Sequence, residues 1–212
     1  MILLIGGEKG GVGKSTIATN LAVGLAINSI DCILVDTDTQ PTSGRFVERR
    51  TENGHLPNIN CIQRTGDVSA TLRDTANRYQ VVIVDAGGRD SKELRTAAVV
   101  ADLMLIPLRA SQADLETLPK INEIISMAKN FNTKLTAFAV LTMASTNPRV
   151  KEAKEARELL EDFDQLQLAE TVICDRKVYR DALLMGKGVI EMDNAGARDE
   201  IHALTKEFFE LS

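Results

Sequence analysis

The chain has 212 residues, of which 44% are hydrophobic, and this is enough apolar material for one α/β domain with a sizeable core. Its formal net charge of −5 excludes a protein that is basic overall, so any binding of nucleic acid must use a local basic patch. The three cysteines are too far apart for a structural metal cluster, and the absence of an 18-residue apolar run argues against a membrane span, so we expect a cytoplasmic protein.

Apolar runs and helical patterns alternate along the whole chain. The runs 2–5, 32–35, 81–84, 103–106 and 135–141 are rich in Val, Ile and Leu on both faces, as parallel strands between two helix layers are. The alternation predicts an α/β fold in a single domain, 1–212, with a doubly wound, mostly parallel sheet and helices on both faces. Three helices are expected between or after these strands. The first has an apolar stripe at helical spacing, made of Leu115, Leu118, Ile121, Ile124, Ile125 and Ala128. The second begins at Asn147-Pro148 and turns Leu159 and Leu160 inward, and the last, over about 195–211, buries Ile201, Leu204, Phe208 and Leu211.

The loops at the carboxyl ends of such strands build the site, and here they are 6–14, 36–44, 85–93, 107–113 and 142–148. The first loop leads into the run Lys9-Gly10-Gly11-Val12-Gly13-Lys14-Ser15-Thr16. Its glycines let successive N–H groups point at phosphate oxygens. Lys14 supplies charge to the β- and γ-phosphates, and the Ser15 hydroxyl is placed to bind Mg²⁺. The pattern G-x-x-x-x-G-K-[ST] would require a glycine at Glu8, and a second lysine, Lys9, stands at the front of the loop instead.

Carboxylates follow the next two strands. Asp36 and Asp38 lie two residues apart at the end of one strand, so one can hold Mg²⁺ or its waters and the other can orient the attacking water. The run 81–84 ends in Asp85, which is typical of an acid that reaches the Mg²⁺ shell through water, and the glycines after it permit a mobile loop near the γ-phosphate. A lysine at position 9 could neutralise phosphate charge across a dimer interface, as an arginine finger does in trans.

Four segments of the chain occur in the order of a known family: KGGVGKS at 9–15, DTDTQ at 36–40, VIVDAG at 82–87 and ADLMLIPL at 101–108. Together they resemble the deviant Walker A ATPases of the ParA/MinD family, which are P-loop NTPases, and the resemblance covers nearly the whole chain. The stretches 171–179 and 200–207 resemble the short plasmid-partition ParA proteins, the ParF-like subgroup.

The resemblance implies roles for individual residues. Lys9 matches the lysine that reaches across an ATP-sandwich dimer, Asp38 the acid tied to hydrolysis, and Asp85 the acid of switch II. The catalytic residues that the resemblance implies are Lys9, Lys14, Asp38 and Asp85, and the implied metal ligands are Ser15, Asp38 and Asp85. The implied nucleotide-binding residues are 9–16 together with Pro107, which lies where proteins of the family border the adenine. Two departures change the loops around this site: Thr39 replaces a proline, and Ala86-Gly87-Gly88 replaces the commoner Thr-Pro-Pro.

Basic residues gather in the last third of the chain, at Arg176, Lys177, Arg180 and Lys187. The resemblance implies that an ATP-bound homodimer binds nucleoid DNA without sequence preference through such residues, in a salt-dependent way. It also implies a small centromere-binding partner, ParB/ParG-like, that stimulates hydrolysis. The acidic end at 207–212 differs from a membrane-targeting helix, which has an apolar face flanked by lysines or arginines, so we expect no membrane binding and interpret Phe208 and Phe209 as packing residues.

The sequence therefore predicts a weak, Mg²⁺-dependent ATPase that uses ATP and releases ADP while it partitions DNA. Three alternatives stay open. The same ATPase could position another cargo, such as conjugation machinery of the VirC type or a protein microcompartment. The chain could be a metabolic P-loop ligase of the dethiobiotin synthetase type, or a regulator that binds nucleotide without hydrolysing it.

Overall fold

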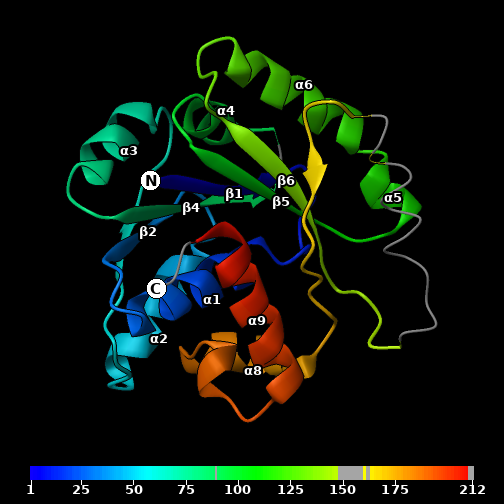
Figure 1. Cartoon of the computed structure of the whole chain (residues 1–212). Coiled ribbons are helices and arrows are strands. Elements are labelled where there is room, and N and C mark those ends of the chain that lie inside the picture. The colour runs from blue at the N-terminus through cyan, green and yellow to red at the C-terminus, as the bar shows by residue number, and fades with distance from the viewer. Residues whose placement is uncertain (89, 148–159, 161–162, 210–212) are drawn as a thin grey trace.

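A parallel sheet forms the centre of the molecule in the computed structural model, which describes residues 1–88, 90–147, 160 and 163–209 (Figure 1). Within these residues the sheet has seven strands in the order β3-β2-β4-β1-β5-β6-β7. All neighbouring strands pair in parallel. The strands are β1 Ile2–Gly7, β2 Cys32–Asp36, β3 Asn60–Gln63, β4 Val81–Gly88, β5 Leu103–Leu108, β6 Thr136–Leu141 and β7 Gln167–Leu168.

Helices cover both faces of this sheet, with α3, α4 and α6 on one face and α1, α2, α8 and α9 on the other (Figure 1). This is the doubly wound α/β arrangement that the alternating pattern predicts, because each parallel connection carries a helix to one face or the other. The helices are α1 Lys14–Ile27, α2 Thr42–Glu52, α3 Ser69–Ala76, α4 Lys92–Ala98, α5 Gln112–Leu115, α6 Leu118–Lys129, α8 Lys177–Met185 and α9 Ala195–Phe208, with a short 3₁₀ turn, η1, at Val189–Glu191.

The apolar core lies in two layers, one on each side of the sheet. One layer packs α3, α4 and α6 against the strands through residues such as Leu72 and Leu94. The other packs α1, α2 and α9 through Leu21, Phe46 and Leu204. Strands β1, β2 and β5 are buried along their whole length, which is why both of their faces are apolar in the sequence.

The secondary-structure predictions differ from the structure at two places, and a third prediction falls outside the described residues. Strands β3 and β7 lie at the two edges of the sheet and were not predicted, because they are short and half-exposed and carry no apolar run. The apolar stripe 115–128 forms two helices, α5 and α6, with Pro119 in the first turn of α6. The helix predicted from Asn147-Pro148 lies outside the described residues apart from Leu160, which is buried.

The end of the chain packs as predicted as far as it is described. Helix α9 ends at Phe208, whose ring lies edge-on to Phe138 with centroids 5.0 Å apart, and Phe209 is buried in the core. Residues 210–212, with Leu211, lie outside the described residues. Among the helices of the described residues, none combines the length and the apolar character that crossing a bilayer requires.

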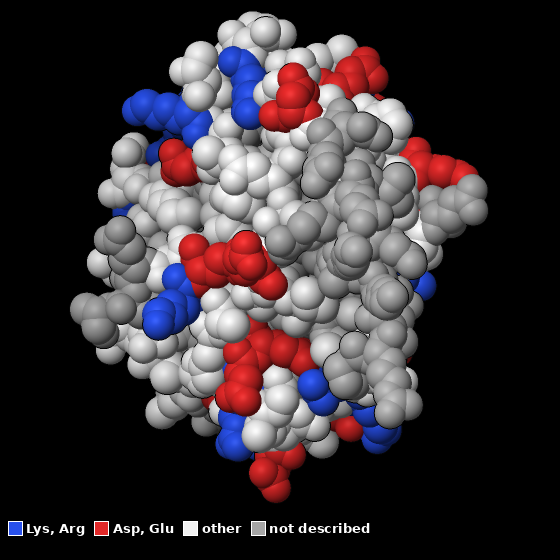
Figure 2. Space-filling model, turned by 45° about the vertical axis from the view of Figure 1, so that its right-hand side comes forward, with Lys and Arg blue, Asp and Glu red and all other residues white. Residues whose placement is uncertain are grey.

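Charged side chains are mixed on the face that Figure 2 shows. Acidic side chains form several clusters, in the middle and lower part of this face and also near its top and right edges, with lysine and arginine side chains beside some of them. The negative net charge of the sequence is therefore visible on this face as acidic clusters rather than as an even spread.

Candidate functional site

In the glycine-rich loop between β1 and α1, carbonyl groups accept hydrogen bonds on the outer side of the loop. The N–H groups of the loop are left to bind a ligand. Gly11 and Gly13 have φ values of 71° and 93°, a left-handed conformation that favours glycine. Within the described part of the chain, no backbone N–H from Gly10 to Ser15 donates a hydrogen bond. Such a row of N–H groups at a helix N-terminus is an anion-binding concavity.

Lys14 lies in this concavity, as its place in the motif predicts. Its side chain is buried, and Nζ donates to the Lys9 carbonyl at 2.6 Å across the base of the loop. Burial lowers the pKa of the Lys14 ammonium, and the carboxylates of Asp85 and Asp38 oppose that shift. A buried ammonium that faces a row of N–H donors provides the charge that a polyphosphate requires.

Asp85, at the end of the buried part of β4, is 1% exposed. Its Oδ2 accepts a hydrogen bond from the Ser43 hydroxyl of α2 at 2.6 Å. Burial raises the pKa of Asp85 to about 7, although the hydroxyls of Ser43 and Ser15 oppose the shift. The predicted metal-site residues Ser15 and Asp85 therefore lie together, with Ser43 as a neighbour that the sequence analysis missed.

The two carboxylates after β2 have different environments. Asp36 is buried, and its oxygens accept from the backbone N–H groups of Asp38 at 3.1 Å and Gly44 at 2.9 Å, so it holds the loop that leads into α2. Burial raises the pKa of Asp36, and those N–H groups oppose the rise. Asp38 accepts from the Gln40 N–H at 2.9 Å and lines the cavity in front of the loop. Of the pair, Asp38 is the one that faces a ligand space.

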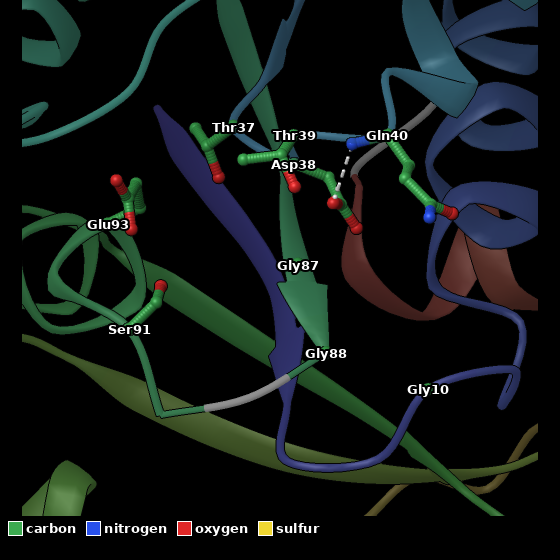
Figure 3. Close-up of a pocket in the computed structure, with 9 residues that line it drawn as sticks. All are labelled: Gly10, Thr37, Asp38, Thr39, Gln40, Gly87, Gly88, Ser91 and Glu93. Carbon is green, nitrogen blue, oxygen red and sulfur yellow. Dashed lines mark hydrogen bonds between the residues drawn. The ribbon is translucent and has the colours of Figure 1, made fainter.

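The cavity in front of the phosphate loop has a volume of about 510 Å³ (Figure 3). In the figure, Asp38 and Gln40 lie on one side of it, Ser91 and Glu93 on the other, and Gly87 and Gly88 between them. Gly88 is required by close approach to the backbone of the loop, whereas a side chain at Gly87 would only crowd the Asp38 side chain. A Cβ on Gly88 would lie 2.9 Å from the Lys9 carbonyl oxygen, and one on Gly87 would lie 3.3 Å from the Asp38 carboxyl carbon.

A second cavity of about 340 Å³ continues along the loop and shares Gly10, Asp38, Gln40 and Gly88 with the first. Lys14, Ser15 and Thr16 of α1 line it, as do Met143, which follows β6, and Leu183 of α8. Pro107 lines neither cavity: it is buried within β5, paired with Val140 of β6. Its predicted place beside adenine therefore gains no support from these cavities.

Side chains from distant strands hold the outside of the loop. Arg109, which follows β5, donates from Nη2 to the Gly11 carbonyl at 2.7 Å. Thr142, which follows β6, donates from Oγ1 to the Val12 carbonyl at 2.8 Å. Both residues lie within loops that the sequence analysis assigned to the site, but nothing in their local sequence indicates a contact with the phosphate loop.

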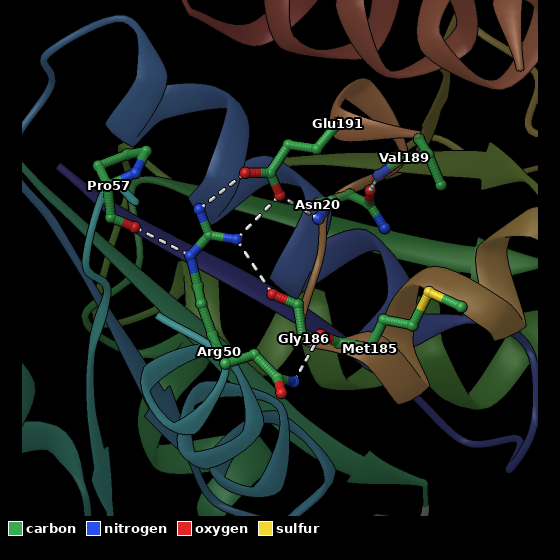
Figure 4. Close-up of polar contacts among 9 residues, drawn as sticks. Asn20, Arg50, Pro57, Met185, Gly186, Val189 and Glu191 are labelled. Atoms are coloured by element: carbon green, nitrogen blue, oxygen red, sulfur yellow. Dashed lines mark hydrogen bonds and ion pairs between the residues drawn. The ribbon is translucent and has the colours of Figure 1, made fainter. Parts of the chain in front are cut away.

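A buried ion pair joins α2 to the segment after α8 (Figure 4). Arg50 is 1% exposed and its two terminal nitrogens bind Glu191 at 2.8 and 2.9 Å. The same guanidinium donates to the carbonyls of Pro57 and Gly186. Since α2 begins at the loop of Asp36 and Asp38, this pair ties that loop to the last third of the chain.

We expect Arg50→Ala to destabilise the protein by about 3 kcal/mol, because it leaves the half-buried Glu191 carboxylate without its cationic partner. Urea unfolding followed by circular dichroism measures the change. Arg45→Ala is the matched control, since Arg45 is exposed on the same helix, and its effect should stay within about 0.5 kcal/mol. Equal effects of the two variants would contradict a structural role for the buried pair.

The raised pKa of Asp85 predicts a pH-dependent stability. The carboxyl is protonated in the folded protein up to about pH 7 but ionises near pH 3.8 when unfolded. The contribution of the Asp85 carboxyl to the free energy of unfolding therefore decreases as the pH rises from about 4 to 7, and above pH 7 it stays constant and destabilising. Asp85→Asn should stabilise the nucleotide-free protein at pH 8, by up to about 4 kcal/mol, and much less at pH 4. Melting temperatures at the two pH values measure this, and the exposed Asp74→Asn should show no such difference.

The predicted DNA-binding residues lie near the start of α8 and just after it, and three of them have carboxylate partners. Arg176 binds Glu200 at 2.8 Å and is 27% exposed. Lys177 binds Asp181 at 3.1 Å and Arg180 binds Asp175 at 2.9 Å, with exposed fractions of 80% and 65%. Lys187 is half-buried after the helix. Arg176 is therefore committed to packing against α9, whereas Lys177 and Arg180 remain accessible.

Comparison with known proteins agrees with this geometry. Residues 3–189 match the family model of the CobQ/CobB/MinD/ParA nucleotide binding domain. The maintenance of carboxysome distribution protein A of Halothiobacillus neapolitanus is 27% identical, over 97% of this chain and 94% of that protein. The chromosome partitioning protein ParA of Myxococcus xanthus is 24% identical, over 91% of this chain and 81% of that protein.

Among solved structures, apo McdA from Cyanothece superposes with a TM-score of 0.81, over 98% of this chain and 99% of that chain, at 18% identity. A likeness at that identity shows the fold alone, and the fold is the P-loop NTPase fold that the sequence predicts. The match of the family model to nearly the whole chain goes further. This chain belongs to the CobQ/CobB/MinD/ParA nucleotide-binding domain family.

Proposed function

We propose that the protein is a Mg²⁺-dependent ATPase of the ParA type, which forms a homodimer with ATP, binds nucleoid DNA without sequence preference and partitions a DNA cargo such as a plasmid. The observation that carries the proposal is that the glycine-rich loop and the buried Lys14 line one cavity together with Ser15. The buried Asp85 lies directly behind Ser15 and accepts from its hydroxyl. Hydrolysis joins a water oxygen to the γ-phosphorus and breaks its bond to the β–γ bridging oxygen, which leaves ADP and phosphate.

The donors around Asp85 fit magnesium. Mg²⁺ prefers hard oxygen ligands and keeps several waters, so one or two carboxylates and a hydroxyl suffice beside the phosphates. Ser15 and Asp85 would hold the Mg²⁺ ion, and Asp38, which lines the cavity, would orient the attacking water. Bound Mg²⁺ neutralises charge that develops on the phosphoryl oxygens.

A second copy of the chain completes the proposed site. Lys9 stands at the front of the loop, is partly exposed, and holds Lys14 through its backbone carbonyl. Its side chain is proposed to reach the phosphates of the partner's nucleotide and to make dimerisation depend on ATP.

DNA binding tests the function. We expect the protein with ATP to sediment as a dimer and to bind DNA of any sequence, and the protein with ADP or without nucleotide to do neither. Electrophoretic mobility shift and sedimentation velocity with the three nucleotide states measure this. Binding that ignores the nucleotide, or a monomer in all three states, would overturn the proposal.

Arg180→Glu should weaken DNA binding equally for unrelated sequences. It should also lower the slope of log K against log salt by about two in a dimer, which is about one for each phosphate that the variant no longer neutralises. Fluorescence anisotropy over a salt series measures the slope. Arg78→Glu is the matched control, because Arg78 is also an exposed arginine paired with an aspartate. An unchanged slope for Arg180→Glu would show that the DNA contacts lie elsewhere.

A second candidate cargo is a protein microcompartment. The relative from Halothiobacillus neapolitanus, named for carboxysome distribution, aligns over nearly the full length of both chains. ATPase activity and DNA binding would be the same for both cargoes. The two are distinguished by which partner stimulates hydrolysis, a centromere-bound protein or one that sits on a shell.

A further inference from the structure

The carbonyl groups on the outside of the phosphate loop are held by donors. Lys14 Nζ donates to Lys9 O, Arg109 Nη2 to Gly11 O, Thr142 Oγ1 to Val12 O, and Ile17 N to Gly13 O. Two of these donors, those of Lys14 and Ile17, belong to the motif and its helix. The other two come from residues that follow β5 and β6, about 100 or more residues further along the chain.

The planar trans peptide unit turns an outward carbonyl into an inward N–H. Within one unit, the C=O of a residue and the N–H of the next point in opposite directions. The bond from Arg109 to Gly11 O therefore turns the N–H of Val12 away from Arg109, toward the inner side of the loop, and the bond from Thr142 to Val12 O turns the N–H of Gly13 in the same way. Gly11 has the left-handed φ of 71°, which glycine adopts without a steric penalty, so the residue does not by itself fix the orientation of this peptide unit.

We propose that Arg109 and Thr142 are positioning residues, which hold the Gly11 and Val12 peptide units so that two N–H groups face the phosphates. This inference rests on the proposed function of the loop as an ATP site. Neither side chain touches the phosphates; each acts through the peptide that it holds.

The two residues hold the loop with different rigidity. Thr142 is 3% exposed, and its backbone N–H bonds to Leu108 O at 2.8 Å, so its hydroxyl is fixed in place. Arg109 is exposed and, within the described residues, forms no ion pair; its bond to Gly11 is its one side-chain hydrogen bond there. The guanidinium therefore adds positive charge beside the loop as well as orientation.

The test measures ATP binding and turnover separately. Thr142→Val keeps the shape of the side chain and removes its donor, and Arg109→Ala removes the other donor. Each is expected to raise the Kd for Mg-ATP about tenfold, as the loss of one oriented hydrogen bond does, while kcat at saturating ATP changes less than about twofold. Titration calorimetry and steady-state kinetics give the two values.

Conservative variants and a remote control separate positioning from folding. Thr142→Ser and Arg109→Lys keep a donor and should bring the Kd to within about threefold of the wild type. Arg78→Ala, at an exposed arginine far along the chain from the loop, should leave it unchanged. The inference is overturned if the Kd stays unchanged in both donor-free variants, or if it rises equally in the conservative ones. A wild-type protein that binds no Mg-ATP would instead overturn the proposed function itself.

Discussion

Lys14→Ala is expected to abolish ATP hydrolysis and to weaken binding of Mg-ATP by about 100-fold or more. The ammonium lies at the base of the cavity, next to the row of N–H groups, and a charged hydrogen bond to phosphate contributes about 1.5–3 kcal/mol. Removing its bonds to two phosphates at once gives the expected factor. Phosphate release and titration calorimetry measure the two effects.

The same variant should remain folded. Without nucleotide, Lys14 is buried against a single carbonyl, and its lowered pKa reports the cost of that burial. Removing the charge is therefore expected to leave the melting temperature unchanged or to raise it. Lys134→Ala is the control, since Lys134 is exposed before β6. Turnover by Lys14→Ala at the wild-type rate would contradict the assignment of the cavity to a triphosphate.

Lys9→Ala is expected to abolish dimerisation with ATP while a single subunit still binds the nucleotide. The substitution keeps the carbonyl that accepts from Lys14, so the loop retains its shape. What it removes is the side-chain charge proposed to reach the partner's phosphates, and that charge enters only when two copies meet. Sedimentation velocity with a slowly hydrolysed ATP analogue measures the dimer, and calorimetry measures nucleotide binding.

The control for this prediction is Lys92→Ala, at an exposed lysine in the first turn of α4. It should dimerise like the wild type. A Lys9→Ala protein that still forms the ATP dimer would show that the lysine does not act in trans. A variant that loses nucleotide binding as well would show that Lys9 serves its own subunit.

Much of the fold was predictable because strands that are buried on both faces consist of apolar residues, which form recognisable runs in the sequence. Strands β1, β2, β4, β5 and β6 lie between two helix layers, and a position buried on both faces must be apolar. The edge strands β3 and β7 have no such constraint, so no apolar run indicates them. The break between α5 and α6 did have a signal, Pro119, which belongs in the first turn of a helix and not in its interior.

The candidate site was predictable only where its residues are neighbours in sequence. The loop 9–16 and the acid at the end of β4 follow local patterns that have few other uses. Ser43, Arg109 and Thr142 contact these residues from far along the chain, and a single Ser, Arg or Thr at the end of a strand or the start of a helix has no pattern that distinguishes it. The pairing of Arg50 with Glu191 was beyond prediction for the same reason.

The sequence by itself determined the phosphate loop, the order of strands and helices, and the family, because each of these is encoded in residues that adjoin one another. The family resemblance already selected Asp38 for the site, but only the tertiary structure shows the physical difference between the two carboxylates after β2: one faces a ligand space and the other holds the backbone. Asp36 and Asp38 are equivalent in a local pattern, but the fold buries the first against N–H groups and leaves the second in a cavity. Burial and hydrogen bonding determine whether a carboxyl group is ionised. Both depend on contacts between segments that are distant in the sequence, so local sequence patterns do not reveal them.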